Sequence, residues 1–226
     1  MHLATRLLCP LLAGLTLFAA PLAAAQPVVV VGHGKLQLPA DITVLDEPLP
    51  GAHTGGDSKR VQQRLLILSS QDRHPRATLI VSTTGGGTRV QWSGGCSGMK
   101  NDEQQFVHHP FHVSREECVY IAGPFDLDAS IDSYATGARA RLEAIGLTIP
   151  QGGYIAHALY ALESGQMLSV DVFLPLPFKG LSTGPRPDAQ GSGIPPALIA
   201  WSLALGEQVR KAMQSISGEW QLPPFE

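Results

Sequence analysis

Two runs of alternating apolar residues meet at the dipeptide Ser164-Gly165, and this arrangement constrains the fold more than any other feature of the sequence. A two-residue turn at this dipeptide predicts an antiparallel hairpin in which Leu159 faces Val170 and His157 faces Val172. One face of the hairpin then carries Ile155, His157, Leu159, Ala161, Leu168, Val170, Val172 and Leu174, and the other carries Tyr154, Tyr160, Ser169 and Asp171. The first face is almost fully apolar, so we expect a second layer of structure to cover it.

Two segments have the apolar spacing of amphipathic helices. Residues 131–145 repeat apolar or small side chains every three or four positions. A stronger stripe runs over residues 196–216, with Pro196 in the first turn, where proline is tolerated. The sequence therefore predicts an α+β fold in which a mostly antiparallel β-sheet has these two main helices packed on one face. No segment repeats and no linker divides the chain, so we expect residues 26–226 to form a single domain.

Glycine and proline are abundant, with 24 and 18 among the 226 residues. Both residues favour turns, so this composition indicates short elements joined by loops and argues against a coiled coil. We expect long loops at residues 46–60, 97–117 and 179–193. Only 15% of the residues are charged and the formal net charge is −3, which argues against a nucleic-acid-binding protein.

The first 25 residues have the layout of a secretory signal peptide. A single positive charge at Arg6 precedes an apolar run over residues 7–20, and three alanines, Ala23 to Ala25, come before Gln26. This pattern predicts a cleaved signal peptide at residues 1–25. We expect the mature chain to be soluble and to be periplasmic or secreted, since no later segment is long and apolar enough to span a bilayer.

Two cysteines, Cys96 and Cys118, remain after the predicted cleavage. An even pair in an exported chain predicts a disulfide bond, which stabilises by about 3 kcal/mol for a loop of this size. The alternative is that Cys96 is an exposed nucleophile served by a downstream histidine. Oxidation would trap such a thiolate outside the cytoplasm, so we favour the disulfide.

Three histidines, His108, His109 and His112, lie close together in the sequence. Imidazole is a common ligand of zinc and copper, so this cluster is the candidate metal site of the chain. Pro110 disfavours a helix through the cluster, and only a turn there would bring His109 and His112 together. Histidines scattered on a surface loop are the simpler interpretation, and a histidine acting as a general base is a third. We expect no cofactor, with zinc or copper as the alternative.

Other motifs carry little chemistry. His157 is expected to be a core histidine, and Asp171, on the opposite face near Tyr160, is a candidate half of an acid–base pair. The glycine-rich segments lack the P-loop, the dinucleotide-binding and the serine-hydrolase patterns. We therefore interpret the segment that holds Trp92, Ser97 and Met99 as a candidate recognition loop.

These absences favour a non-enzymatic protein. We expect an exported binding or accessory protein of the cell envelope, which contacts another protein or an envelope component through its loops. The rival hypothesis is a metal-dependent or histidine-assisted enzyme centred on His108, His109 and His112. A third is a carrier of a small apolar ligand held between the sheet and the helices.

Overall fold

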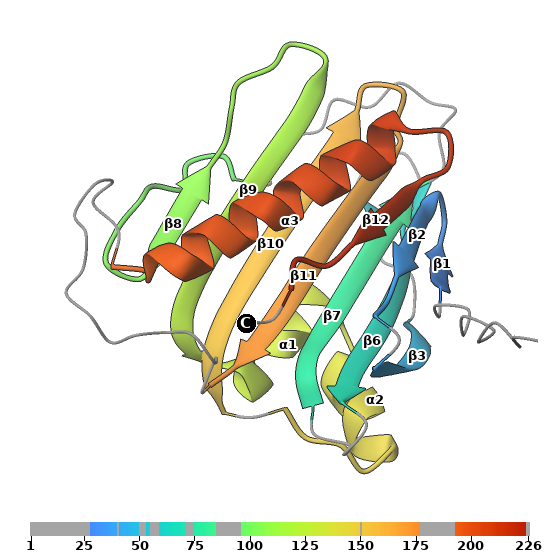
Figure 1. The fold of residues 1–226 in the computed structure, drawn as a ribbon, viewed down its shortest axis with the longest axis vertical. Coiled ribbons are helices and arrows are strands. Elements are labelled where there is room, and N and C mark those ends of the chain that lie inside the picture. The colour runs from blue at the N-terminus through green and yellow to red at the C-terminus, as the bar shows by residue number, and fades with distance from the viewer. Residues whose placement is uncertain are drawn as a thin grey trace, which may run out of the picture.

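A computed structural model describes residues 28–39, 41–49, 53–54, 59–70, 75–84, 96–149, 151–176 and 193–224. Its centre is a seven-stranded sheet in the order β3-β6-β7-β11-β10-β9-β8, in which all neighbours are antiparallel (Figure 1). The strands are β3 (Ile42–Leu49), β6 (Gln62–Ser70), β7 (Pro75–Thr84), β8 (Gln105–His108), β9 (Arg115–Asp126), β10 (Gly152–Leu162) and β11 (Met167–Pro175). The predicted α+β class with a mostly antiparallel sheet is confirmed.

A smaller three-stranded sheet joins the two ends of the described chain. It has the order β1-β2-β12, formed by β1 (Val28–Val31), β2 (Gly34–Gln37) and β12 (Glu219–Gln221). The β1 and β2 strands are antiparallel, whereas β12 runs parallel to β2. A two-stranded ribbon, β4 (His53–Thr54) with β5 (Lys59–Arg60), completes the strands.

The long helix α3 (Pro196–Gln214) lies across one face of the central sheet (Figure 1). Its buried stripe follows the predicted spacing, and it packs on Ala158, Val170 and Val172, which are fully buried. The helix ends before Ile216, which the prediction included and which is fully exposed. Periodicity therefore predicted the face of this helix correctly and its last turn wrongly.

The second predicted helix is two short helices on the opposite face of the sheet. They are α1 (Leu127–Tyr134) and α2 (Ala138–Ala144), separated at Gly137, whose backbone has a positive φ of 83°. Both pack on Ile80, Ile155 and Phe173, which belong to a core separate from that under α3. The expectation that both main helices cover one face is wrong, because this sheet buries apolar residues on both faces.

The register of the β10–β11 hairpin also differs from the prediction. Ala161 pairs with Met167, so His157 faces Asp171 and not Val172. The loop holds one more residue than expected: the amide of Leu162 donates to the carbonyl of Gln166 at 2.8 Å, with Gly165 at φ 84°. A slip of one residue moves every side chain of one strand to the other face. Ser169 and Asp171 therefore share the face of His157.

The expected loops are partly ordered structure. The β3 strand continues to Leu49 within residues 46–60, and β8 and the start of β9 lie within residues 97–117. Residues 179–192 and the predicted signal peptide, residues 1–25, lie outside the described residues. Among the residues that are described, no helix is long and apolar enough to cross a membrane.

Candidate functional site

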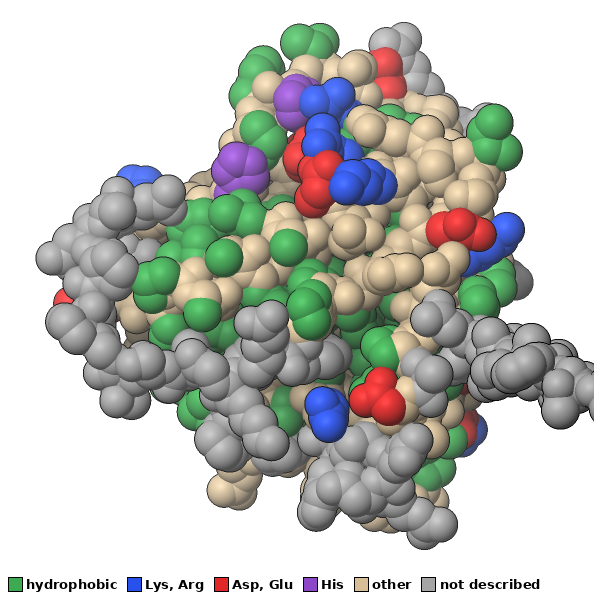
Figure 2. Space-filling model, in the orientation of Figure 1, with side chains coloured by type: hydrophobic (Ala, Val, Ile, Leu, Met, Phe, Trp, Pro, Cys, Tyr) green, Lys and Arg blue, Asp and Glu red, His purple; other side chains and the backbone are tan. Residues whose placement is uncertain are grey.

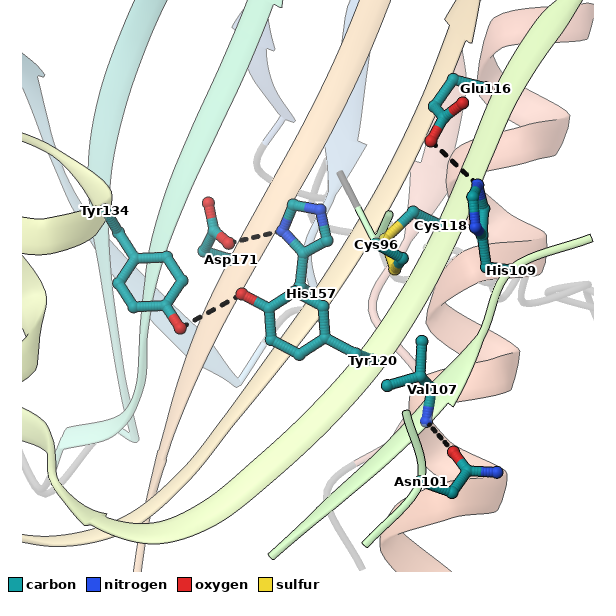
Figure 3. The surroundings of a disulfide bond; sticks show 10 residues. All are labelled: Cys96, Asn101, Val107, His109, Glu116, Cys118, Tyr120, Tyr134, His157 and Asp171. Carbon is teal, nitrogen blue, oxygen red and sulfur yellow. Dashed lines mark hydrogen bonds and ion pairs between the residues drawn. A yellow bond between two sulfur atoms is a disulfide. The ribbon is translucent and has the colours of Figure 1, made fainter. Parts of the chain in front are cut away.

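The predicted disulfide is present and ties a loop to the central sheet. Cys96 and Cys118 are bonded, with their Cα atoms 5.6 Å apart, and both are buried. Cys118 lies within β9, so the bond holds the segment that begins at Cys96 against the sheet (Figure 3). Neither sulfur is a free thiol, which removes the nucleophile interpretation of Cys96.

The segment after Cys96 covers the outer edge of β8. The side chain of Asn101 accepts a hydrogen bond from the amide of Val107 at 2.6 Å, and the amide of Asp102 donates to the carbonyl of Gln105 at 3.0 Å. Unpaired edge groups would otherwise be open to another strand. Of the predicted recognition residues, Ser97 is exposed and Met99 is half-buried in this segment, and Trp92 lies outside the described residues.

The three clustered histidines lie at the β8–β9 hairpin and have different surroundings. His108 is exposed at the end of β8. His109 Nε2 lies 2.9 Å from Glu116 Oε1 (Figure 3), and His112 Nε2 lies 2.9 Å from Arg115 Nη2 and 3.5 Å from Glu117 Oε2. Across the described ranges, no group of three or more His, Cys, Asp or Glu side chains is arranged to hold a metal ion.

The tip of this hairpin, residues 109–114, exposes apolar side chains. Phe111 is 87% exposed and Val113 is 94% exposed. Hydrophobic, histidine and charged side chains gather where the hairpin projects from the sheet (Figure 2). The paired glutamates, Glu116 and Glu117, are adjacent on β9, so they contact their histidines on opposite sides of the hairpin.

A buried polar cluster lies on the face of the sheet that α1 and α2 cover. His157 Nδ1 lies 2.6 Å from Asp171 Oδ1, and these side chains are only 13% and 8% exposed. The ring of Tyr120 stacks on the imidazole with centroids 4.8 Å apart. The Tyr120 hydroxyl donates to the hydroxyl of Tyr134, on α1, at 3.1 Å (Figure 3). The register predicted from the sequence had placed His157 and Asp171 on opposite faces of the sheet.

Hydrogen bonding and burial determine where the protons of this cluster lie. A carboxylate only accepts hydrogen bonds, so the short contact with Asp171 assigns the shared proton to Nδ1 of His157. Burial raises the pKa of both Tyr120 and Tyr134 above the ordinary value, so both hydroxyls stay protonated at neutral pH. His157 Nε2 is buried and has no hydrogen-bond partner within the described ranges.

One signal in the sequence would have found this cluster. Glu163 precedes Ser164-Gly165, and a three-residue loop that ends in glycine at a left-handed position is a common hairpin connection. That choice would have placed Asp171 opposite His157. The contribution of Tyr134 has no such signal, since it depends on how α1 packs on the sheet.

Comparison with protein-family models, with curated proteins and with solved structures finds no match to the chain. Function is therefore inferred from the geometry of the hairpin tip and of the buried cluster.

Proposed function

We propose that the protein is an exported, non-enzymatic binding or accessory protein of the cell envelope, which contacts a protein partner through the tip of the β8–β9 hairpin. The observation that carries this proposal is the exposure of Phe111 and Val113, at 87% and 94%, two positions apart at the tip of a projecting hairpin. A single exposed apolar residue is ordinary, but neighbouring ones on a protruding element are typical of an interaction site.

Side-chain contacts at the start of β9, where the hairpin leaves the sheet, hold the tip in place. The His109–Glu116 and His112–Glu117 contacts lie on opposite sides of the hairpin, and the guanidinium of Arg115 lies 5.8 Å from the ring centroid of Tyr160. The amide of Gln214, at the end of α3, donates to the Tyr160 hydroxyl at 2.9 Å. A tip that is held in position loses less conformational entropy on binding, which favours affinity.

The tip accounts for part of an interface only. Burial of one phenylalanine and one valine contributes about 1.5 to 3 kcal/mol each. Association of two proteins costs about 4 kcal/mol or more in lost translational and rotational freedom. The partner must therefore also contact the surroundings of the tip, with Phe111 as the central anchor of the interface.

The experiment is affinity capture from an envelope extract with a double variant, Phe111→Ser with Val113→Ser. Both side chains contact mostly solvent, so we expect the variant to fold as the wild type does. A partner captured by the wild type should bind the double variant at least about tenfold more weakly. The matched control is Leu203→Ser, a 37% exposed leucine of α3, which should keep the partner. Equal capture by the wild type and the double variant would rule the tip out.

A further inference from the structure

The contact between Arg115 and His112 ties the hairpin tip to the start of β9 and depends on protonation. Arg115 Nη2 lies 2.9 Å from His112 Nε2. The guanidinium group stays charged and only donates hydrogen bonds, so Nε2 of the histidine is the acceptor. An imidazole that accepts at Nε2 is neutral and carries its proton on Nδ1. The contact therefore requires a neutral His112.

Protonation of His112 removes this hydrogen bond. The added proton occupies the nitrogen that accepts from Arg115, so two cations meet where one hydrogen bond was. Histidine is the side chain whose ordinary change of charge falls between pH 5 and 8. The lone pair of Nε2 is used by Arg115 and is not a metal ligand in this arrangement. We therefore expect mild acid to break the link between the tip and β9.

Arg115 has a second partner within a short distance. Its Nε atom is buried and has no hydrogen-bond partner among the described residues, and Oε2 of Glu117 lies 3.8 Å from it. The same oxygen lies 3.5 Å from His112 Nε2. A small movement would bring Arg115 Nε within hydrogen-bond distance of this carboxylate. The guanidinium thus has two arrangements, one on neutral His112 and one on Glu117.

His109, on the other side of the hairpin, responds differently to acid. Its Nε2 lies 2.9 Å from a carboxylate oxygen of Glu116, so protonation places opposite charges next to each other and keeps the contact. His108 is exposed at the end of β8. Of the three histidines, His112 is the one whose described contact requires a neutral ring.

Charged and titratable groups from three elements surround the pair. On α3, hydrogen bonding to Glu207 and the charge of Glu117 raise the pKa of Arg210. At the end of β10, the ring of Tyr160 lies under the guanidinium of Arg115. The full set is His108, His109, Glu116, Glu117, Tyr160, Glu163, Glu207, Arg210 and Lys211. Two of these, His108 and His109, are also histidines, so the test must separate His112 from them.

We propose that His112 is a pH-dependent latch of the hairpin tip, held by Arg115 when neutral and released when protonated, so that partner binding weakens in acid. This regulation rests on the proposed function of the tip. His112 lies between Phe111 and Val113, so its release removes the fixed placement of both apolar side chains. Loss of a hydrogen bond to a charged group corresponds to a change of about tenfold in affinity.

The first test is nuclear magnetic resonance of the purified protein without a partner. At pH 7.5 we expect His112 to carry its proton on Nδ1 alone, and at pH 5.0 on both nitrogens. The Nε–H signal of Arg115 should move with the same midpoint, and the order parameters of the amides of residues 111–113 should fall.

Two matched variants separate the histidines. In His112→Gln the side-chain oxygen still accepts from Arg115 and does not titrate, so the arginine signal should stay at its position at pH 7.5. His109→Gln makes the same change on the other side of the hairpin and should titrate as the wild type does. A proton on Nε2 of His112 at pH 7.5, or an Arg115 signal that titrates equally in His112→Gln, would overturn the proposal.

The second test is capture from the envelope extract at pH 7.5 and pH 5.0. The wild type and His109→Gln should bind the captured partner about tenfold more weakly at pH 5.0, and the pH dependence should be smaller in His112→Gln. The same pH dependence in all three proteins would overturn the latch. Phe111→Ser with Val113→Ser should lose capture at both pH values but keep the titration of Arg115. Absence of capture with an intact titration would therefore overturn the proposed function alone.

Discussion

His157 and Asp171 face each other across the β10–β11 hairpin, and their Nδ1 and Oδ1 atoms lie 2.6 Å apart on the face of the sheet that α1 covers. Both side chains are largely buried, at 13% and 8% exposure. A buried charge is tolerated where a hydrogen-bonding partner compensates for it. The pair therefore fixes the ring orientation of His157.

Removing the carboxylate should destabilise the protein. In Asp171→Ala the Nδ1–H of His157 becomes a buried donor without an acceptor, so we expect a loss of about 2 to 3 kcal/mol in the free energy of unfolding. Asp171→Asn keeps an acceptor oxygen and should lose about 1 kcal/mol. Urea denaturation at pH 7 measures both, with the slope m unchanged. An Asp171→Ala variant as stable as the wild type would show that the contact contributes nothing.

Alkaline pH should destabilise the fold through the buried tyrosines. The pKa of Tyr120 and of Tyr134 is raised by burial in the folded state. Below the ordinary tyrosine pKa of about 10 both states are protonated and the contribution is complete. Above it the unfolded chain ionises first, so stability falls by about 1.4 kcal/mol per pH unit for each such group.

Spectrophotometric titration near 295 nm checks this expectation. The chain holds 4 tyrosines, and we expect the signal of the buried ones to appear only together with loss of structure. Tyr120→Phe should reduce the pH dependence of stability above pH 10. A reversible titration of every tyrosine near pH 10 in the folded state would contradict the burial of these hydroxyls.

The parts of the fold that sequence predicted are those that local patterns determine. The apolar stripe of α3 can be recognised in the sequence because Leu198, Leu205 and Val209 repeat at helical spacing among polar neighbours. The disulfide follows from two cysteines alone. The face of the sheet that each helix covers cannot be predicted in this way. Because β11 is buried on both faces, the alternation of its side chains does not indicate which face a helix covers.

The site depends on features beyond the reach of local patterns. A single additional loop residue, Glu163, decides whether Asp171 meets His157, and the two turn lengths suit the same sequence. The neighbour of β11 on its other side is β7, which is about 90 residues earlier in the chain. Exposure of Phe111 is likewise set by how far the hairpin projects from the sheet, not by its own residues.

Loss of the disulfide should loosen the segment that covers β8. Cys96 and Cys118 are separated by 22 residues, so replacing both by alanine should lower the free energy of unfolding by about 3 kcal/mol. Alanine avoids a buried hydroxyl. Hydrogen exchange should speed up at the amide of Val107, which donates to Asn101, and stay slow at amides in the β10–β11 ladder. Uniform exchange across the sheet would mean that the bond acts on the whole fold.

The close approach of α3 to the sheet should make Gly206 intolerant of a side chain. A Cβ at this position would overlap Cγ2 of Val119 on β9. Gly206→Ala gains about 1 kcal/mol of helix propensity, but overpacking of a dense core costs about 1 to 3 kcal/mol, so we expect a net loss. The reverse substitution at an exposed site of the same helix, Ala204→Gly, calibrates the propensity contribution.

A double-mutant cycle separates the two effects. Val119→Ala removes the methyl group that Gly206→Ala would overlap, so Gly206→Ala should be less destabilising in that background, with a coupling of about 1 kcal/mol or more. Thermal and urea unfolding of the four proteins give the coupling. If the two substitutions are additive, the helix moves away from β9 without strain, and the spacing between α3 and the sheet is set by other contacts, such as those of Leu205 and Val209 with the apolar core.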